Sequence, residues 1–113
     1  KKKIAVGNID TYRDYSWVTE IVKAIILTSE LNAKDFIISA GKKVSGKEIL
    51  SLSYKLNKLD YKKYFSVKEK FYRKSEDKFL IGSNKNSLYL KKNFNFEFKI
   101  FGNRLINKMY KFL

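Results

Sequence analysis

The chain has 113 residues, 44% of them hydrophobic and 16% aromatic, which is enough for one packed domain and unlike a disordered polypeptide. It contains no cysteine and no histidine, so disulfides, thiolate or imidazole zinc sites, cysteine nucleophiles and serine–histidine triads are excluded. The formal net charge is +14, but 22 of the 25 basic residues are lysines spread along the chain among acidic residues, which is typical of a solvated surface and disfavours nucleic-acid binding.

The first part of the chain predicts two short strands and a helix. Residues 4–6 are an apolar run that ends at a glycine, as expected of a short strand. Ser16 is a candidate cap for a helix from about residue 17 to residue 30, where apolar side chains repeat at helical spacing. Residues 36–38 are predicted to form a buried strand that stops at Gly41.

The middle of the chain opens with a capping box at residues 45–48, which predicts the start of a second helix. One side of that helix carries apolar residues that should pack on a core, namely Ile49, Leu52, Leu56 and Leu59. Residues 65–72 are then predicted to be extended, and residues 79–82 to form another short strand that ends in a turn.

The last third predicts a helix over residues 87–92, an extended segment and a final helix. The extended segment alternates apolar and polar residues, with Phe94, Phe96, Phe98 and Ile100 on one face. The final helix carries Leu105, Ile106, Met109 and Leu113. The predicted fold class is therefore α/β. No apolar stretch approaches the roughly 20 residues that a membrane helix needs, so we expect a soluble, cytoplasmic protein.

Four blocks of residues along the chain are informative when they are taken together and in order. They are residues 3–10 with 13–15, residues 35–41, residues 59–61, and residues 71–73 with Glu76. Together they resemble the C-terminal, substrate-binding region of the GDP-mannose 4,6-dehydratases, a family of extended short-chain dehydrogenases/reductases. The resemblance implies that residues 1–113 are one substrate-binding domain, a fragment of a longer enzyme. Its fold would be a small satellite lobe of about three helices and several short strands, normally packed on a Rossmann domain.

The resemblance also implies a binding site for GDP-mannose or a related nucleotide sugar. Arg13 and Arg73 would contact the diphosphate, where guanidinium groups form bidentate hydrogen bonds. Glu76 would accept a hydrogen bond from a ribose hydroxyl, and Asn8 would line the nucleotide pocket. Simpler alternatives remain open for each residue. Arg13 can pair with a neighbouring aspartate (Asp10 or Asp14), Arg73 with Glu69 or Glu76, and Asn8 can serve only as a turn residue.

The chain departs from the family pattern beside this site. A proline and a small residue are expected between the second arginine and the glutamate, but Lys74 and Ser75 stand there. An apolar residue is expected after the glutamate, but Asp77 follows it. A Gly-Trp-x-Pro-like stretch is replaced by the phenylalanine-rich residues 93–99. Losing the proline loosens the backbone that aims Arg73.

No catalytic residue and no metal ligand is assigned in this chain. Two Tyr-x-x-x-Lys pairs are present, at Tyr54 with Lys58 and at Tyr64 with Lys68, but chance produces about as many in so lysine-rich a chain. Gly-x-Gly-x-x-Gly is absent, so we expect no cofactor here and NADP or NAD in the intact lyase. The alternative function is a stand-alone basic module that binds anions or nucleic acid, and a homo-oligomer is left open.

Overall fold

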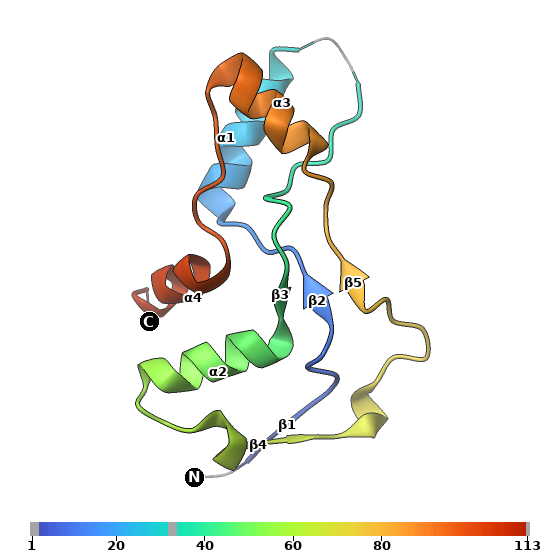
Figure 1. Ribbon diagram of the computed structural model, residues 1–113, viewed down its shortest axis with the longest axis vertical. Helices are drawn as coiled ribbons and strands as arrows, with labels where there is room; N and C mark the ends of the chain where they lie inside the picture. Colours follow the sequence, from blue (N-terminus) through green and yellow to red (C-terminus); the bar gives the residue numbers. More distant parts are fainter. Residues whose placement is uncertain (1–2, 32–33, 113) are drawn as a thin grey trace.

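The structure, a computed structural model, describes residues 3–31 and 34–112 (Figure 1). The described residues form four α-helices, which are α1 (Val18–Ser29), α2 (Gly46–Leu56), α3 (Lys85–Phe94) and α4 (Gly102–Tyr110). They also form five short strands, which are β1 (Ile4–Val6), β2 (Tyr12–Arg13), β3 (Val44–Ser45), β4 (Phe65–Val67) and β5 (Phe79–Leu80). Two short 3-10 turns are η1 (Tyr61–Lys63) and η2 (Glu69–Phe71). The predicted α/β class is confirmed, with four helices where about three were expected.

The strands pair into two small sheets. Strands β1 and β4 are parallel, with Ile4 opposite Phe65. In the second sheet β2 is the central strand, antiparallel to β3 and parallel to β5. Arg13 in β2 therefore stands opposite Val44 on one side and Leu80 on the other. This pairing brings the segment that leads into β5 alongside Arg13.

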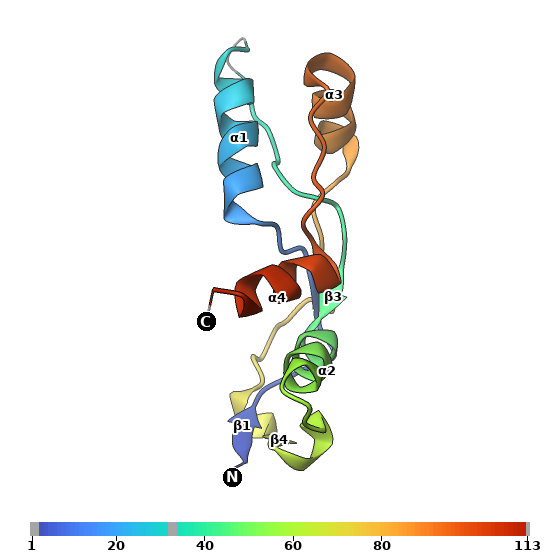
Figure 2. The same cartoon turned by 90° about the vertical axis from the view of Figure 1, so that its left-hand side faces the viewer.

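The main core lies between α1 and α3, which overlap in Figure 1 and stand side by side in Figure 2. Ala24 of α1 and Leu90 of α3 have no exposed surface, and Ala40 and Phe98 complete the buried cluster. The rings of Phe96 and Phe98 meet edge to face at 5.2 Å. Phenylalanines from the segment after α3 thus close this core, as the alternating pattern predicted for Phe98.

The second helix begins where its sequence predicts. The Ser45 hydroxyl accepts a hydrogen bond from the Glu48 backbone N–H at 3.1 Å, and the Glu48 carboxylate accepts one from the Ser45 N–H at 2.8 Å. This capping box fixes α2 directly after β3. The apolar side of α2 is half-buried, and Ile49 shares a surface with Ile106 and Met109 of α4.

The predicted strand over residues 36–38 is wrong, because these residues pair with no strand, and side chains bond the backbone at Ile37 and nearby at Ala40. The Asn86 amide donates to the Ile37 carbonyl at 3.1 Å, and the Ala40 N–H donates to the Ser16 hydroxyl at 3.3 Å. Ser16 is consequently not a helix cap, and the cap position of α1 is Trp17, without a side-chain hydrogen bond.

Other element boundaries also differ from the predictions. The extended segment 65–72 is a strand only to Val67 and then turns into η2. Helix α3 includes Phe94 and stops at Asn95, whose left-handed backbone (φ 52°) lets the Phe96 N–H bond the Leu90 carbonyl at 3.3 Å. Leu113, predicted for the last helix, lies outside the described residues. Within the described part of the chain, no helix combines the length and hydropathy of a membrane span.

The Asp14 carboxylate joins three segments that are distant in sequence. Its Oδ2 atom accepts hydrogen bonds from the Gly41 N–H at 2.9 Å and from the Gly82 N–H at 3.2 Å. Gly82 must lack a side chain, because a Cβ there would collide with the Ser39 hydroxyl. Asp14, which follows Arg13, therefore holds the loop at Gly41 and the segment after β5 next to the start of α1.

We expect Leu90→Ala to lower the free energy of unfolding by about 2–5 kcal/mol, because it leaves a cavity in a fully buried position. Leu88, two residues earlier in the same helix and 59% exposed, is the matched control, and Leu88→Ala should cost less than about 0.5 kcal/mol. Urea denaturation followed by circular dichroism measures both. Equal losses would show that the α1–α3 core is misplaced.

We expect Asp14→Ala to cost about 2–4 kcal/mol of unfolding free energy, because two backbone N–H groups lose a charged acceptor. Asp10, which is exposed and four residues earlier, is the control, and Asp10→Ala should change the same free energy by less than about 0.5 kcal/mol. A neutral result for Asp14→Ala in denaturant titrations would contradict the three-segment role of this carboxylate.

Candidate functional site

Strand β2 places the Arg13 guanidinium over the loop that leads into β5. Its Nη1 atom donates to the Tyr12 carbonyl at 2.7 Å and to the Asp77 carbonyl at 3.1 Å. Its Nη2 atom donates to Glu76 Oε1 at 3.0 Å. The hydrogen bond from the Tyr12 N–H to the Lys78 carbonyl at 2.7 Å draws the same loop to β2. The planar guanidinium therefore holds residues 76–78 in place.

Two of the predicted site residues, Arg13 and Glu76, meet although 63 residues separate them. Their side chains are 22% and 20% exposed, so the ion pair is partly shielded from water. A partly buried pair with additional backbone hydrogen bonds is worth more than an exposed surface pair. The alternative pairings of Arg13 with Asp10 or Asp14 do not occur, since Asp14 instead bonds the backbone of Gly41 and Gly82.

Arg73 lies three residues before Glu76, in the exposed segment that follows η2. Within residues 3–31 and 34–112, its guanidinium has no hydrogen-bond or ion-pair partner. The alternative pairing with Glu76 fails because Glu76 is taken by Arg13, and no pairing with Glu69 forms there either. The loop before β5 thus carries Arg73 without a partner among the described residues, while Arg13 of β2 is neutralised by Glu76.

Asn8 forms a local turn at the end of β1. Its Oδ1 atom accepts a hydrogen bond from the Asp10 N–H at 2.9 Å, as the turn alternative predicts. The preceding Gly7 passes close to Phe71, because a Cβ on Gly7 would lie 3.2 Å from the Phe71 carbonyl oxygen. Asn8 therefore follows a residue that lies against Phe71, and its side-chain oxygen is already engaged.

The acidic residues near the start of α1 accept hydrogen bonds from backbone N–H groups of different segments. Glu20 accepts hydrogen bonds from the Lys99 N–H at 2.9 Å and from the Ile100 N–H at 3.1 Å, while Asp14 binds a different loop. In the described part of the chain, no three carboxylates gather as metal ligands would. The role of Asp14 was missed from sequence, and the only local signal was its place beside Arg13.

An aromatic pair beside the arginine was also missed. Tyr12 and Phe79 stack with their ring centroids 4.9 Å apart, because β2 and β5 place them opposite each other. The Lys43 ammonium lies 5.1 Å and 5.3 Å from the two centroids. In the sequence, Tyr12 and Phe79 are two aromatic residues 67 positions apart, and nothing local relates them. Only the pairing of β2 with β5 shows that the two rings meet.

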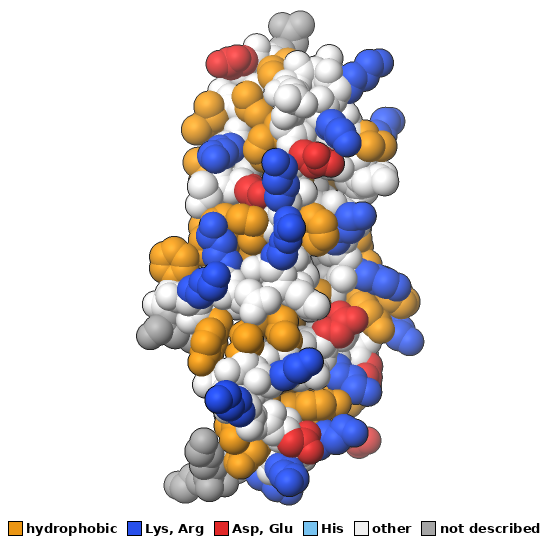
Figure 3. Space-filling view, turned by 60° about the vertical axis from the view of Figure 1, so that its left-hand side comes forward, with side chains coloured by type: hydrophobic (Ala, Val, Ile, Leu, Met, Phe, Trp, Pro, Cys, Tyr) orange, Lys and Arg blue, Asp and Glu red, His pale blue; other side chains and the backbone are white. Residues whose placement is uncertain are grey.

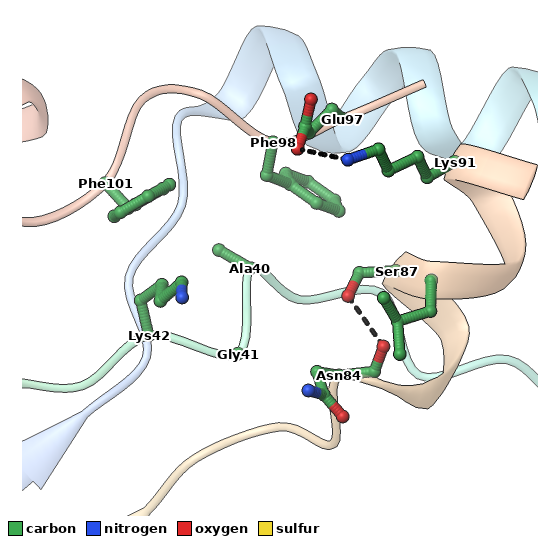
Figure 4. A pocket seen from close by; sticks show the side chains of 10 residues that line it. Ala40, Gly41, Lys42, Asn84, Ser87, Lys91, Glu97, Phe98 and Phe101 are labelled. Atoms are coloured by element: carbon green, nitrogen blue, oxygen red, sulfur yellow. Dashed lines mark hydrogen bonds and ion pairs between the residues drawn. The ribbon is translucent and has the colours of Figure 1, made fainter. Parts of the chain in front are cut away.

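A separate cavity of about 320 Å³ lies between the loop at Gly41, the outer side of α3 and the segment after it (Figure 4). Figure 4 shows Phe98 beneath the ion pair that Lys91 makes with Glu97 at 3.2 Å. None of the four predicted site residues lines this cavity. We call Arg13, Glu76 and Arg73 the arginine cluster, in which Arg73 is three residues from Glu76 along the chain; the cluster lies outside this pocket.

Comparisons with known proteins agree with this architecture. A solved structure of RMD from Pseudomonas aeruginosa complexed with NADPH is similar to the chain, with a TM-score of 0.74 and 18% sequence identity. At that identity the likeness shows the fold alone, and it covers 96% of this chain but 35% of the other, so the chain spans about a third of that relative. The sequence model of the family described as GDP-mannose 4,6 dehydratase matches residues 1–109. Because that match covers nearly the whole chain, the protein belongs to the GDP-mannose 4,6-dehydratase family.

Proposed function

We propose that this chain is the nucleotide-sugar-binding lobe of a GDP-mannose 4,6-dehydratase, and that GDP-mannose or a close relative is its ligand. The single observation that carries the proposal is the contact of Arg13 with Glu76, three residues from an unpaired Arg73. A diphosphate is a ligand group that favours two convergent arginines, because each guanidinium offers it paired donors. In this family lobe the cluster is the part of the surface best suited to a nucleoside diphosphate.

The contacts of each residue suggest which part of the ligand it would bind. Arg73, which is exposed and unpaired, would bind a phosphate directly. Arg13 would hold Glu76 in place while its Nε and its remaining Nη2 hydrogen stay available to the diphosphate. The free Glu76 oxygen would accept a ribose hydroxyl. Asn8 would contribute only through its amide nitrogen, since its oxygen closes a turn.

The reaction itself would need the remainder of the family fold. A nicotinamide cofactor, NADP or NAD, supplies the hydride acceptor and donor for the sugar in an enzyme of this kind. The chain contains no Gly-x-Gly-x-x-Gly turn to hold a dinucleotide, so its residues do not fit that cofactor. The lobe would therefore bind and orient the nucleotide sugar for a Rossmann domain, in a lyase that we place in the cytoplasm.

The alternative of a nucleic-acid-binding module has less support. The face in Figure 3 shows lysine and arginine side chains spread from end to end, with acidic and hydrophobic side chains between them. Binding to a nucleic-acid backbone favours basic residues gathered into a patch or stripe. We therefore prefer the arginine cluster as the anion site.

Titration of the isotopically labelled chain with GDP-mannose should shift amide resonances around Arg73, Glu76 and Arg13 in two-dimensional NMR spectra. Arg73→Lys should weaken this binding by about five- to thirty-fold, because charge is kept but the paired donors are lost. The melting temperature should stay unchanged, since Arg73 has no partner to lose among the described residues.

Arg104 is the matched control for this substitution. It is the third arginine of the chain, is exposed, and makes one long hydrogen bond at 3.4 Å to the Lys99 carbonyl. Arg104→Lys should leave GDP-mannose binding unchanged, and NADPH should cause no saturable shifts. Equal weakening in both variants, or shifts spread over the lysines, would contradict the proposed site.

Arg13→Lys should weaken GDP-mannose binding and also lower the unfolding free energy by about 1–2 kcal/mol, because a lysine cannot bridge Glu76 and the Asp77 carbonyl together. Glu76→Gln should remove most of the same stability, and the double variant should lose less than the sum of the two. Thermal and denaturant unfolding test this coupling. Additive losses would mean that the two side chains act independently.

A further inference from the structure

A cavity of about 320 Å³ lies where the loop at Gly41, helix α3 and the segment after α3 meet, and we call it the Gly41 cavity. This volume is at the lower end of the range for small-molecule sites in proteins. Gly41 has a left-handed backbone (φ 70°), and a Cβ there would lie 3.2 Å from the Asn84 Cβ. The lack of a side chain at Gly41 therefore lets the loop approach the start of α3 and form one wall of the cavity.

The apolar part of the lining comes from the core and from the segment after α3. Ala40 and Phe98 are each 7% exposed, and Phe101 is half-buried. Figure 4 shows the Phe98 ring between Phe101 and the side chain of Ser87. Aromatic rings gain contact energy beyond area burial when another ring packs on them, so this lining favours a ligand with a flat apolar body.

The charged side chains of the lining carry one positive charge in excess. Glu97 is paired with Lys91 at 3.2 Å, whereas Lys42 has no ion pair within residues 3–31 and 34–112. The Lys42 ammonium lies 5.9 Å from the Phe101 ring centroid, so the unpaired charge and an aromatic ring share one end of the cavity. An anionic group of a ligand would accept a charge-assisted hydrogen bond from Lys42 at this end.

The end of the cavity next to α3 offers uncharged hydrogen-bonding groups. Asn84 is the cap residue of α3, but in the described part of the chain its side-chain amide makes no hydrogen bond to the helix or to another residue. The Ser87 hydroxyl donates to the Asn84 carbonyl at 2.7 Å, which leaves the Ser87 oxygen as an acceptor. A hydroxyl group on the far side of a ligand would therefore find a partner here.

We propose that the Gly41 cavity binds a small aromatic carboxylate. Its carboxylate would lie at Lys42, its ring against Phe98 and Phe101, and a polar substituent at Asn84 or Ser87. Inorganic phosphate would satisfy Lys42 but leave the two phenylalanine rings uncovered, and a neutral sugar would leave Lys42 without an anion. The proposal does not rest on the nucleotide-sugar site, because none of the residues of the arginine cluster lines this cavity.

The test uses 4-hydroxybenzoate as the probe and 4-hydroxybenzamide, an uncharged molecule of nearly the same shape, as its control. The acid should cause saturable shifts of the Gly41, Ser87 and Phe98 amide resonances in two-dimensional NMR spectra of the labelled chain. We expect a Kd on the order of a millimolar, as for a ligand of about ten heavy atoms. The amide should bind about tenfold more weakly, because it forms no charge-assisted hydrogen bond with Lys42.

Lys42→Gln should weaken 4-hydroxybenzoate binding about tenfold and leave 4-hydroxybenzamide binding unchanged. Lys43→Gln is the matched control and should change neither, because Lys43 is also exposed but its ammonium lies over the rings of Tyr12 and Phe79. Circular dichroism checks that both variants remain folded. The absence of saturable shifts up to about 10 mM acid, equal binding of acid and amide, or equal weakening by the two lysine variants would overturn the proposal.

Adding GDP-mannose to the 4-hydroxybenzoate complex distinguishes this proposal from the proposed function. Retention of the acid in the cavity, while resonances shift around Arg73 and Glu76, supports two separate sites. Displacement of the acid by GDP-mannose would overturn the proposal, because the cavity would then belong to the nucleotide-sugar site. A chain that binds the acid but not GDP-mannose would contradict the proposed function alone.

Discussion

The dipeptide Arg13-Asp14 at the end of β2 joins segments that are distant in the sequence. Asp14 binds the backbone at Gly41 and Gly82, while Arg13 binds Glu76 and the Asp77 carbonyl. The two neighbouring side chains therefore bind different segments, Asp14 the loops at Gly41 and Gly82 and Arg13 the loop before β5. Without this junction, β5 would lose its position beside β2, and the arginine cluster would lose its geometry.

The same junction restrains the loop that follows Arg73, where the chain has no proline. The family pattern places a proline after this arginine, which restricts the backbone, and this chain has Lys74 there. Arg13 supplies a different restraint, because its guanidinium fixes Glu76 by a 3.0 Å ion pair and the Asp77 carbonyl by a hydrogen bond. This restraint acts on Glu76 and Asp77, which follow Arg73 in the loop. Arg13 therefore holds the C-terminal side of the loop that carries Arg73.

Local signals predicted the elements that depend on local interactions. The capping box at Ser45 and Glu48 is complete within four residues, so the start of α2 followed from sequence. The error over residues 36–38 has the opposite cause, since their neighbourhood is stabilised by Ser16 and Asn86, which propensity does not reveal. Arg13 and Glu76 were named through the family resemblance, but their contact across 63 residues required the strand pairing of β2 with β5.

The flatness of the lobe follows from how few side chains it buries. Its core cluster is two helices and the phenylalanine segment, and α2 with α4 form a second, half-buried layer that extends the slab rather than thickening it. A lobe of this shape gains little hydrophobic stabilisation for its length, because burial scales with apolar area removed from water. The long-range polar contacts of Asp14 and Arg13 therefore add restraints between segments that the small core does not join. They also concentrate ordered polar groups at the end of β2.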